Sequence, residues 1–209
     1  MRFLIALALS SFVAGSASVP RAAEPVGPAP GGQPPMRSPF GGRIPAIPGV
    51  IEAEDFDNGP EGVAYHDGTP ENRGNRQGHR STPVDLDLTL DGKITCVAFI
   101  QPNEWLTYTV EVAVNGTYDV EVSASGVGNA RNQGFRGEFR IEFDGVDVTG
   151  PIEAPDTKAW DSFAIVKRSG VRLTQGIRTM RIHMGTRQGN FNVDSVKFTR
   201  TGRLPPGNP

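Results

Sequence analysis

Two glutamates near the start of the folded part of the chain could bind a metal ion. Glu52 and Glu54 stand two residues apart in the stretch from Val50 to Phe56, so on a strand both side chains would project from one face. Ionised carboxylates at this spacing repel one another unless a cation or a shared proton relieves them. Calcium prefers such oxygen ligands. A solvated strand face is the plainer alternative, and a glycosidase carboxylate pair is a third interpretation.

An aromatic ring in a polar loop could bind a sugar. Trp160 follows the polar residues 155–159, and its flat ring could stack on the apolar face of a pyranose or fold back over the core. Asn192 and Asp194 stand at the start of the last expected strand, where they could reach a ligand or ion or simply shape a turn. Trp105 stands among strand residues, so we expect it to be structural.

The segments that would position these residues alternate with a period of two. Apolar side chains at every second position from Leu106 to Val112 predict a strand with one buried face. Asn115 and Gly116 favour a tight turn, and alternation resumes from Tyr118 to Val122, which predicts a hairpin.

The rest of the domain repeats this pattern. Residues 139–143 lead into Asp144-Gly145 and out through Val146, as in a second hairpin, and further strand-like runs follow at 163–166, 171–173, 180–184 and 193–198. No helical stripe interrupts them. Many short strands separated by turn residues predict an all-β fold, an antiparallel β-sandwich of the jelly-roll kind.

Composition divides the chain into four parts. Residues 1–23 are typical of a signal peptide, because Arg2 precedes an apolar run and small residues follow it. An N-terminal membrane anchor is the alternative, but the apolar run is shorter than a membrane span requires. Residues 24–48 are rich in proline and glycine and predict a linker. Residues 49–201 would form the folded module, and 202–209 a flexible tail. We therefore expect a secreted, extracellular or periplasmic protein with no membrane span.

Charge and cysteine content exclude several function classes. A formal charge of −2 gives no broad electrostatic attraction for nucleic acid or anionic membrane. Three histidines and the single Cys96 cannot build a Cys-rich zinc site or an internal disulfide framework. We expect Cys96 to be a small buried hydrophobe and the protein to be a monomer.

Five segments together resemble the carbohydrate-binding modules of family 6. Residues 47–56 look like the opening of that family, and 61–67 resemble its next segment, Glu-Gly-Val-Ala-Tyr-His-Asp. Residues 103–110 are similar to the family's Gly-Glu-Trp-Leu-Glu-Tyr-Thr-Val strand, and 157–160 and 190–198 match its later aromatic loop and closing strand. The resemblance covers essentially the whole domain in the right order.

The resemblance implies a calcium-stabilised β-sandwich that binds a polysaccharide or oligosaccharide among loops at one end. It places Glu52, Glu54 and Asp194 on structural calcium ligands, with backbone carbonyls from residues 72–76.

The same resemblance assigns the sugar site. Trp160 falls on the stacking aromatic, Asn192 on an amide that binds hydroxyls, and Glu61 near a cleft carboxylate. The family commonly closes its cleft with a tyrosine that precedes an arginine, and here the corresponding position is expected at His79, before Arg80.

The expected function is thus non-catalytic carbohydrate binding. A cell-envelope structural or adhesion protein that has lost sugar binding is an alternative, supported by the histidine at position 79. A glycoside hydrolase is another, with acid and base drawn from a small set of carboxylates. That set comprises Glu52, Glu54, Glu61, Asp67 and Glu104. Xylan, β-glucans and agar-type galactans all remain open as ligands.

Overall fold

The computed structural model describes residues 36–76, 78–128, 136–186 and 191–204. These ranges belong to one compact unit, Pro35–Pro209. The expected signal peptide, the first part of the expected linker and the last residues of the tail lie outside the described residues.

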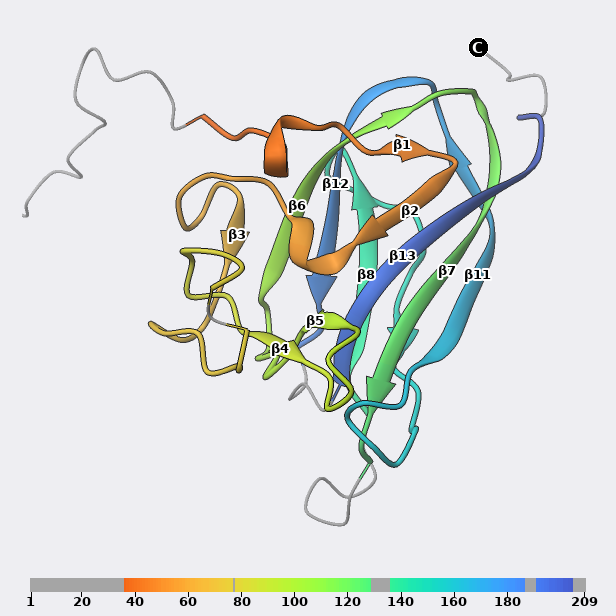
Figure 1. Ribbon diagram of the computed structural model, residues 1–209. Coiled ribbons are helices and arrows are strands. Elements are labelled where there is room, and N and C mark those ends of the chain that lie inside the picture. The colour runs from red at the N-terminus through yellow and green to blue at the C-terminus, as the bar shows by residue number, and fades with distance from the viewer. Residues whose placement is uncertain (1–35, 77, 129–135, 187–190, 205–209) are drawn as a thin grey trace, which may run out of the picture. The chain divides into compact units, whose positions relative to one another are not determined.

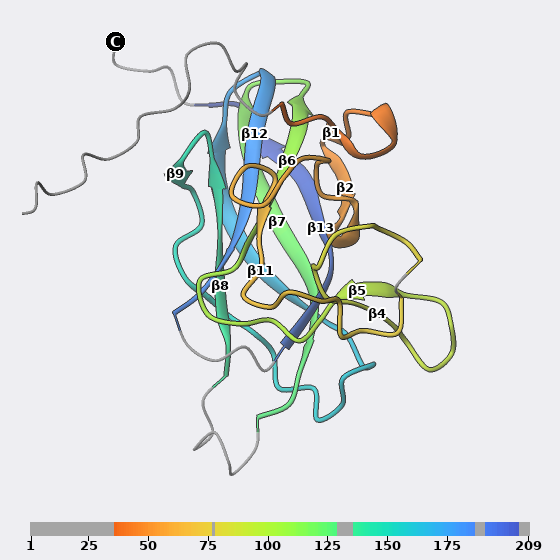
Figure 2. The same cartoon turned by 90° about the vertical axis from the view of Figure 1, so that its left-hand side faces the viewer.

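Two β-sheets packed face to face form this unit (Figures 1 and 2). The first sheet has the strand order β1-β6-β12-β8-β10, with β3 paired to β6 and β9 paired to β8. Its strands are β1 (Ala46–Ile47), β3 (Tyr65–His66), β6 (Trp105–Val112), β8 (Glu138–Phe143), β9 (Val146–Asp147), β10 (Ile152–Glu153) and β12 (Gly176–Met184). The pairs are antiparallel except β1 with β6.

The second sheet has the order β11-β7-β13-β5-β4, with β2 paired to β13. Its strands are β2 (Gly49–Glu52), β4 (Leu86–Leu88), β5 (Thr95–Val97), β7 (Gly116–Gly126), β11 (Ala164–Leu173) and β13 (Phe191–Gly202), all antiparallel. Together the two sheets confirm the predicted antiparallel β-sandwich.

Helical structure in the described residues is confined to two short 3₁₀ turns, η1 (Phe40–Gly42) and η2 (Ala53–Asp55). No helix within the described ranges is long and apolar enough to cross a membrane.

The hydrophobic core fills the space between the sheets. β6 turns Leu106, Tyr108 and Val110 inward, and β7 turns Val120 and Val122 inward from the opposite side. These side chains are at most 3% exposed. The period-two alternation therefore predicted the buried faces correctly.

The first predicted hairpin is wrong, because β6 and β7 belong to different sheets. The turn at Asn115 and Gly116 carries the chain from one sheet to the other. Asn115 bonds to two distant segments. Its carbonyl accepts hydrogen bonds from the Arg200 guanidinium, and its Oδ1 accepts the N–H of Gln175 at 2.6 Å. Burial of alternate side chains looks the same whether the next strand lies beside the first or faces it.

The second predicted hairpin is confirmed. β8 and β9 pair antiparallel around Asp144 and Gly145, which have φ angles of 50° and 81°. Two successive positive φ angles suit a tight turn between twisted strands.

The N-terminal arm, defined here as residues 36–48, packs against the sandwich although it falls within the expected linker. β1 pairs with β6, Ile47 is fully buried, and Ser38 forms a β-bridge with Asn58. The Arg37 guanidinium donates to Thr179 Oγ1 at 2.7 Å. The folded part thus begins before Gly49, because a few apolar and polar anchors suffice to hold a proline-rich segment.

Candidate functional site

Loops at one end of the sandwich enclose a pocket of about 280 Å³. Trp160, from the loop between β10 and β11, and Asn192, at the start of β13, both line it. The structure thus brings together two of the four residues expected at the sugar site. The pocket is also lined by Phe99, Gln101 and Asp87.

Two half-exposed aromatic rings share this pocket. The side chains of Trp160 and Phe99 are each 48% exposed, and both line the cavity. Large exposed apolar rings in a concave site offer contact area to a ligand. The second ring is therefore Phe99, which the sequence analysis did not single out.

The backbone at Phe99 explains why the sequence did not reveal it. Phe99 lies within the apolar run from Cys96 to Ile100, a pattern typical of a buried strand. Its φ angle is 50°, an unfavourable value for a bulky residue. This left-handed turn takes the ring out of the strand alternation and onto the wall of the pocket.

The Trp160 loop is anchored to two strands of the second sheet. Ser125 Oγ on β7 donates to the Trp160 carbonyl at 2.6 Å, and Asn192 Nδ2 on β13 donates to the same oxygen at 3.1 Å. Thr157 N–H donates to the Gly126 carbonyl at 2.9 Å. Since Ser125 and Asn192 are buried, these bonds hold the loop in one position.

A buried carboxylate holds the turn that follows Phe99. Glu104 accepts the N–H groups of Gln101 and Gly68 at 2.8 and 2.9 Å. Burial is the largest influence and raises the pKa of Glu104 to about 7, although both backbone bonds oppose it. Glu104 was among the candidate catalytic acids, and the structure gives it a positioning role instead.

The described lining residues give the pocket one negative charge. Among the described residues that line it, only Asp87 on β4 carries a charge. Asp87 Oδ1 accepts the N–H of Asn75 at 3.1 Å. A carboxylate in such a wall accepts hydrogen bonds from hydroxyl groups and repels anions.

His79 lies elsewhere. Its ring centroid is 5.4 Å from that of Phe40, and its Nε2 lies 3.4 Å from Asp55 Oδ1. The next residue, Arg80, is buried and donates to the Phe56 carbonyl at 2.5 Å. The buried Arg80 therefore holds His79 beside η2, outside the pocket that Trp160 lines.

Glu61 also stands outside the pocket. Its Oε1 lies 2.5 Å from His66 Nδ1, and its Oε2 accepts the N–H of Asp67 at 3.2 Å. These contacts place the carboxylate beside β3.

The two glutamates expected to bind a metal do not share a strand. Glu52 ends β2, whereas Glu54 lies on η2, where the chain leaves the sheet (Figure 1). This corrects the expectation of one common strand face.

Asp194 nevertheless comes close, because β2 pairs with β13 and Glu52 lies opposite Ser195. Asp194 occupies a register shift between Val193 and Ser195, and such a bulge redirects a side chain. The strand that ends at Glu52 therefore lies beside the last strand of the chain.

Glu54 is the least satisfied of these carboxylates. Its Oε2 is buried and has no hydrogen-bond partner among the described residues. Its pKa is raised to about 8, first by burial and then by the negative charges of Asp55, Glu52 and Asp194. The pKa of Glu52 is raised too, first by burial and then by Asp194. A bound cation would offset the cost of burying these charged carboxylates and would also screen the repulsion between them.

The loop expected to supply carbonyls lies along β4. Asn72 Oδ1 accepts the N–H groups of Gly74 and Leu86 at 2.8 and 3.2 Å, and Arg76 N–H donates to the Leu86 carbonyl. β4 pairs with β5, which pairs with β13. Within the described ranges, however, no three His, Cys, Asp or Glu side chains form a metal-binding group. Carbonyl oxygens would have to complete any such site, which suits the all-oxygen preference of calcium.

The sequence matches the family described as "Carbohydrate binding module (family 6)" over residues 77–200. No curated protein matches it significantly.

Several solved structures share the fold. The C-terminal CBM6 of LamC, from Zobellia galactanivorans, has 18% identity and a TM-score of 0.53, covering 72% of this chain and 98% of its own. CsCBM6-3 from Clostridium stercorarium, solved with cellobiose, has 15% identity and a TM-score of 0.55, covering 77% and 99%. A β-1,3-glucan-binding CBM6 from Bacillus halodurans has 16% identity and a TM-score of 0.54, covering 76% and 100%. At these identities the likeness shows the fold alone.

Proposed function

Because this chain belongs to family 6 of the carbohydrate-binding modules, we propose that it binds a neutral polysaccharide or oligosaccharide in the pocket between Phe99 and Trp160. The observation that carries this proposal is the pair of half-exposed rings in one pocket with polar side chains between them. The family is one of non-catalytic binding modules.

The pocket offers both kinds of contact that a pyranose needs. The rings of Phe99 and Trp160 supply apolar area for its C–H faces. Asp87 supplies acceptors for hydroxyl groups, and Asn192 offers its Oδ1, to which no described residue donates. A few polar groups on an apolar wall are typical of small-ligand sites.

The charge of the pocket narrows the ligand class. A uronate or sulfate group would face the carboxylate of Asp87 without a compensating cation among the described lining residues. Repulsion in a partly desolvated site then opposes binding. Neutral glycans avoid this cost and gain a hydrogen-bond acceptor.

The dispersal of the acidic residues supports binding without catalysis. Glycoside hydrolysis uses two carboxyl groups on either side of the scissile bond. Among the described lining residues, Asp87 is the single carboxylate, while Glu104 holds a turn and Glu61 lies beside His66.

A structural calcium ion is part of the same proposal. Glu52, Glu54 and Asp194 would hold it together with carbonyls from residues 72–76. Bound calcium would give the buried Glu54 carboxylate a positively charged partner, since its Oε2 has no hydrogen-bond partner among the described residues. It would also link η2 to β13. The orphaned Oε2 of Glu54 is the observation that supports it.

Export completes the proposal. It rests on the signal-like residues 1–23, which lie outside the described part of the chain. N-terminal sequencing of the protein recovered outside the cytoplasm would test it, with a start after Ala17, Ser18 or Ala23 expected.

Calorimetric titration tests the sugar-binding site. The ligands are cellohexaose, laminarihexaose and xylohexaose, and the proteins are the wild type and the double variant F99A/W160A. We expect the wild type to bind at least one of them and the double variant to lose most of that affinity. Equal affinity of the two proteins would contradict the site, and silence of the wild type across neutral glycans would contradict the function.

A further inference from the structure

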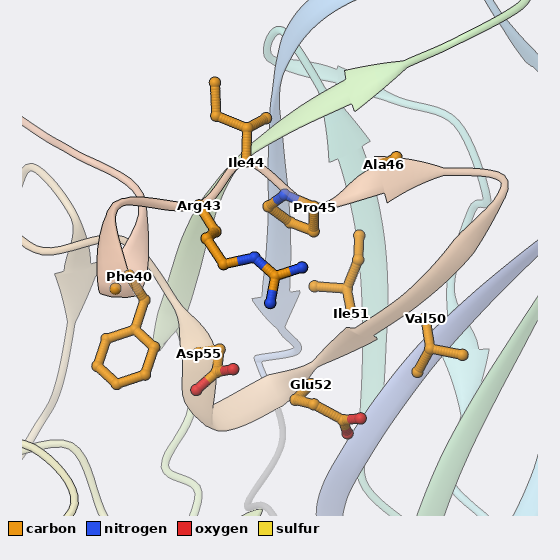
Figure 3. A pocket seen from close by; sticks show the side chains of 10 residues that line it. Phe40, Arg43, Ile44, Pro45, Ala46, Val50, Ile51, Glu52 and Asp55 are labelled. Carbon is orange, nitrogen blue, oxygen red and sulfur yellow. The ribbon is translucent and has the colours of Figure 1, made fainter.

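A second pocket, of about 470 Å³, lies between the N-terminal arm and the β2–η2 segment (Figure 3). Its walls include Phe40, Arg43, Pro45, Val50, Ile51 and Asp55. None of its lining residues belongs to the pocket between Phe99 and Trp160. The two cavities are therefore separate.

The guanidinium of Arg43 is available to a ligand. Figure 3 shows it extending into the space between the arm and β2. Its side chain has no hydrogen bond or ion pair with any described residue, although Glu52 and Asp55 line the same pocket. An arginine side chain carries five N–H donors, and here all of them remain for a ligand or water.

Asp55 adds a hydrogen-bond acceptor to this pocket, and Phe40 adds apolar surface. Asp55 Oδ1 lies 3.4 Å from His79 Nε2, and its Oδ2 has no donor among the described residues. The Phe40 ring packs on the guanidinium of Arg80, 4.4 Å from its centroid. The ring is thus held in place while it lines the pocket.

The walls of this pocket are preformed. Pro45 accepts the N–H of Glu111 at 2.9 Å, and β2 pairs with β13. Gly49 packs so closely on the arm that a Cβ atom there would lie 2.4 Å from the Ala46 carbonyl oxygen. Val50, at the rim, is 51% exposed.

We propose that this pocket is a second saccharide-binding site. Arg43 donates hydrogen bonds to sugar oxygens, Asp55 accepts one from a hydroxyl, and the Phe40 ring contacts a C–H face, while Val50 adds apolar surface at the other end of the pocket. The presence of a cation and carboxylates together favours a neutral, hydroxyl-rich ligand over a purely anionic or cationic one. This inference takes its ligand class from the proposed function. Two sites on one module would strengthen attachment to a polymer through avidity.

Titration of F99A/W160A, in which the first pocket is disabled, isolates the second. The probe is whichever of cellohexaose, laminarihexaose and xylohexaose binds the wild type. We expect weak residual binding that Arg43→Ala reduces by roughly tenfold, the worth of one charge-assisted hydrogen bond. Arg172→Ala, at an exposed arginine on β11, is the matched control and should leave the residual binding unchanged. Thermal unfolding checks that each variant folds.

The outcomes separate this inference from the first proposal. Complete loss of binding in F99A/W160A, or residual binding indifferent to Arg43→Ala, overturns the second site and leaves the first one standing. Unchanged binding in F99A/W160A that is lost on Arg43→Ala overturns the first site and supports the second. A wild type that binds none of the three probes overturns both.

Discussion

The amide of Asn192 donates a hydrogen bond to the backbone carbonyl of Trp160, 32 residues earlier in the chain, at 3.1 Å. The same carbonyl accepts a bond from Ser125 Oγ. The exposed ring of Trp160 is thus carried on a loop whose backbone is tied to two core strands. A preorganised ring loses little conformational entropy on binding, so a loop residue can serve as a stable platform.

Replacement of Trp160 by alanine is expected to weaken saccharide binding roughly tenfold to a hundredfold, because the lost apolar contact is worth about 1 to 3 kcal/mol. The fold should survive, since the side chain is 48% exposed. Calorimetry measures the affinity, and Ile165→Ala, at an exposed apolar residue of β11, is the control. Unchanged affinity in Trp160→Ala would show that the ring is not part of the site.

Phe99 and His79 can be distinguished by the same measurement. Phe99→Ala is expected to reduce affinity by a similar factor, and Phe99→Tyr to retain it, because the ring lines the pocket. His79→Ala should leave this site's affinity close to wild type, since that ring does not line the pocket between Phe99 and Trp160. If His79→Ala weakened binding and Phe99→Ala did not, His79 and not Phe99 would be the second ring of the site.

Asp87→Asn is expected to change selectivity more than affinity. The wild type should prefer a neutral xylo-oligosaccharide to one that carries glucuronic acid, and the variant should narrow this preference several-fold by removing the repulsion. Higher salt should narrow the wild-type preference in the same direction. A wild type that favours the acidic ligand would contradict the assigned charge selectivity.

Calcium removal is expected to lower the melting temperature by several degrees. At 100 times its dissociation constant, a ligand bound only to the folded state adds about 2.7 kcal/mol of stability. Calcium should restore the loss and magnesium should not, because magnesium demands a tighter octahedral shell. Scanning calorimetry in chelator and in millimolar calcium makes the comparison.

Glu54→Gln provides the matched variant for the metal. It removes the charge but keeps the shape, so its melting temperature should not respond to calcium. Identical wild-type melting curves in chelator and in calcium would leave Glu54 as a buried carboxyl without a metal.

The thiol of Cys96 is expected to resist labelling in the native protein. Burial, and then the nearby carboxylates of Asp87, Asp194 and Glu54, raise its pKa to about 12. Very little thiolate, the reactive species, therefore exists at pH 8. Labelling should become fast only in denaturant, and rapid reaction of the folded protein would contradict the buried environment.

Local pattern alone determined much of this protein. Alternating side chains predicted β6, β7 and β8, because one buried face imposes a period of two on any strand. Asp144 and Gly145 predicted their turn, because it needs positive φ angles that those residues tolerate. The resemblance to family 6, and not the local pattern, assigned Trp160 and Asn192 to one sugar site, and both line the same pocket.

Only the tertiary structure decided the remaining features. A buried face does not reveal whether its partner strand lies beside it or across the core, so the sequence could not place β6 and β7 in separate sheets. Phe99 reaches the pocket through a positive φ angle, and His79 is drawn away by the buried Arg80. These positions depend on contacts between residues far apart in the chain, and neither composition nor periodicity records such contacts.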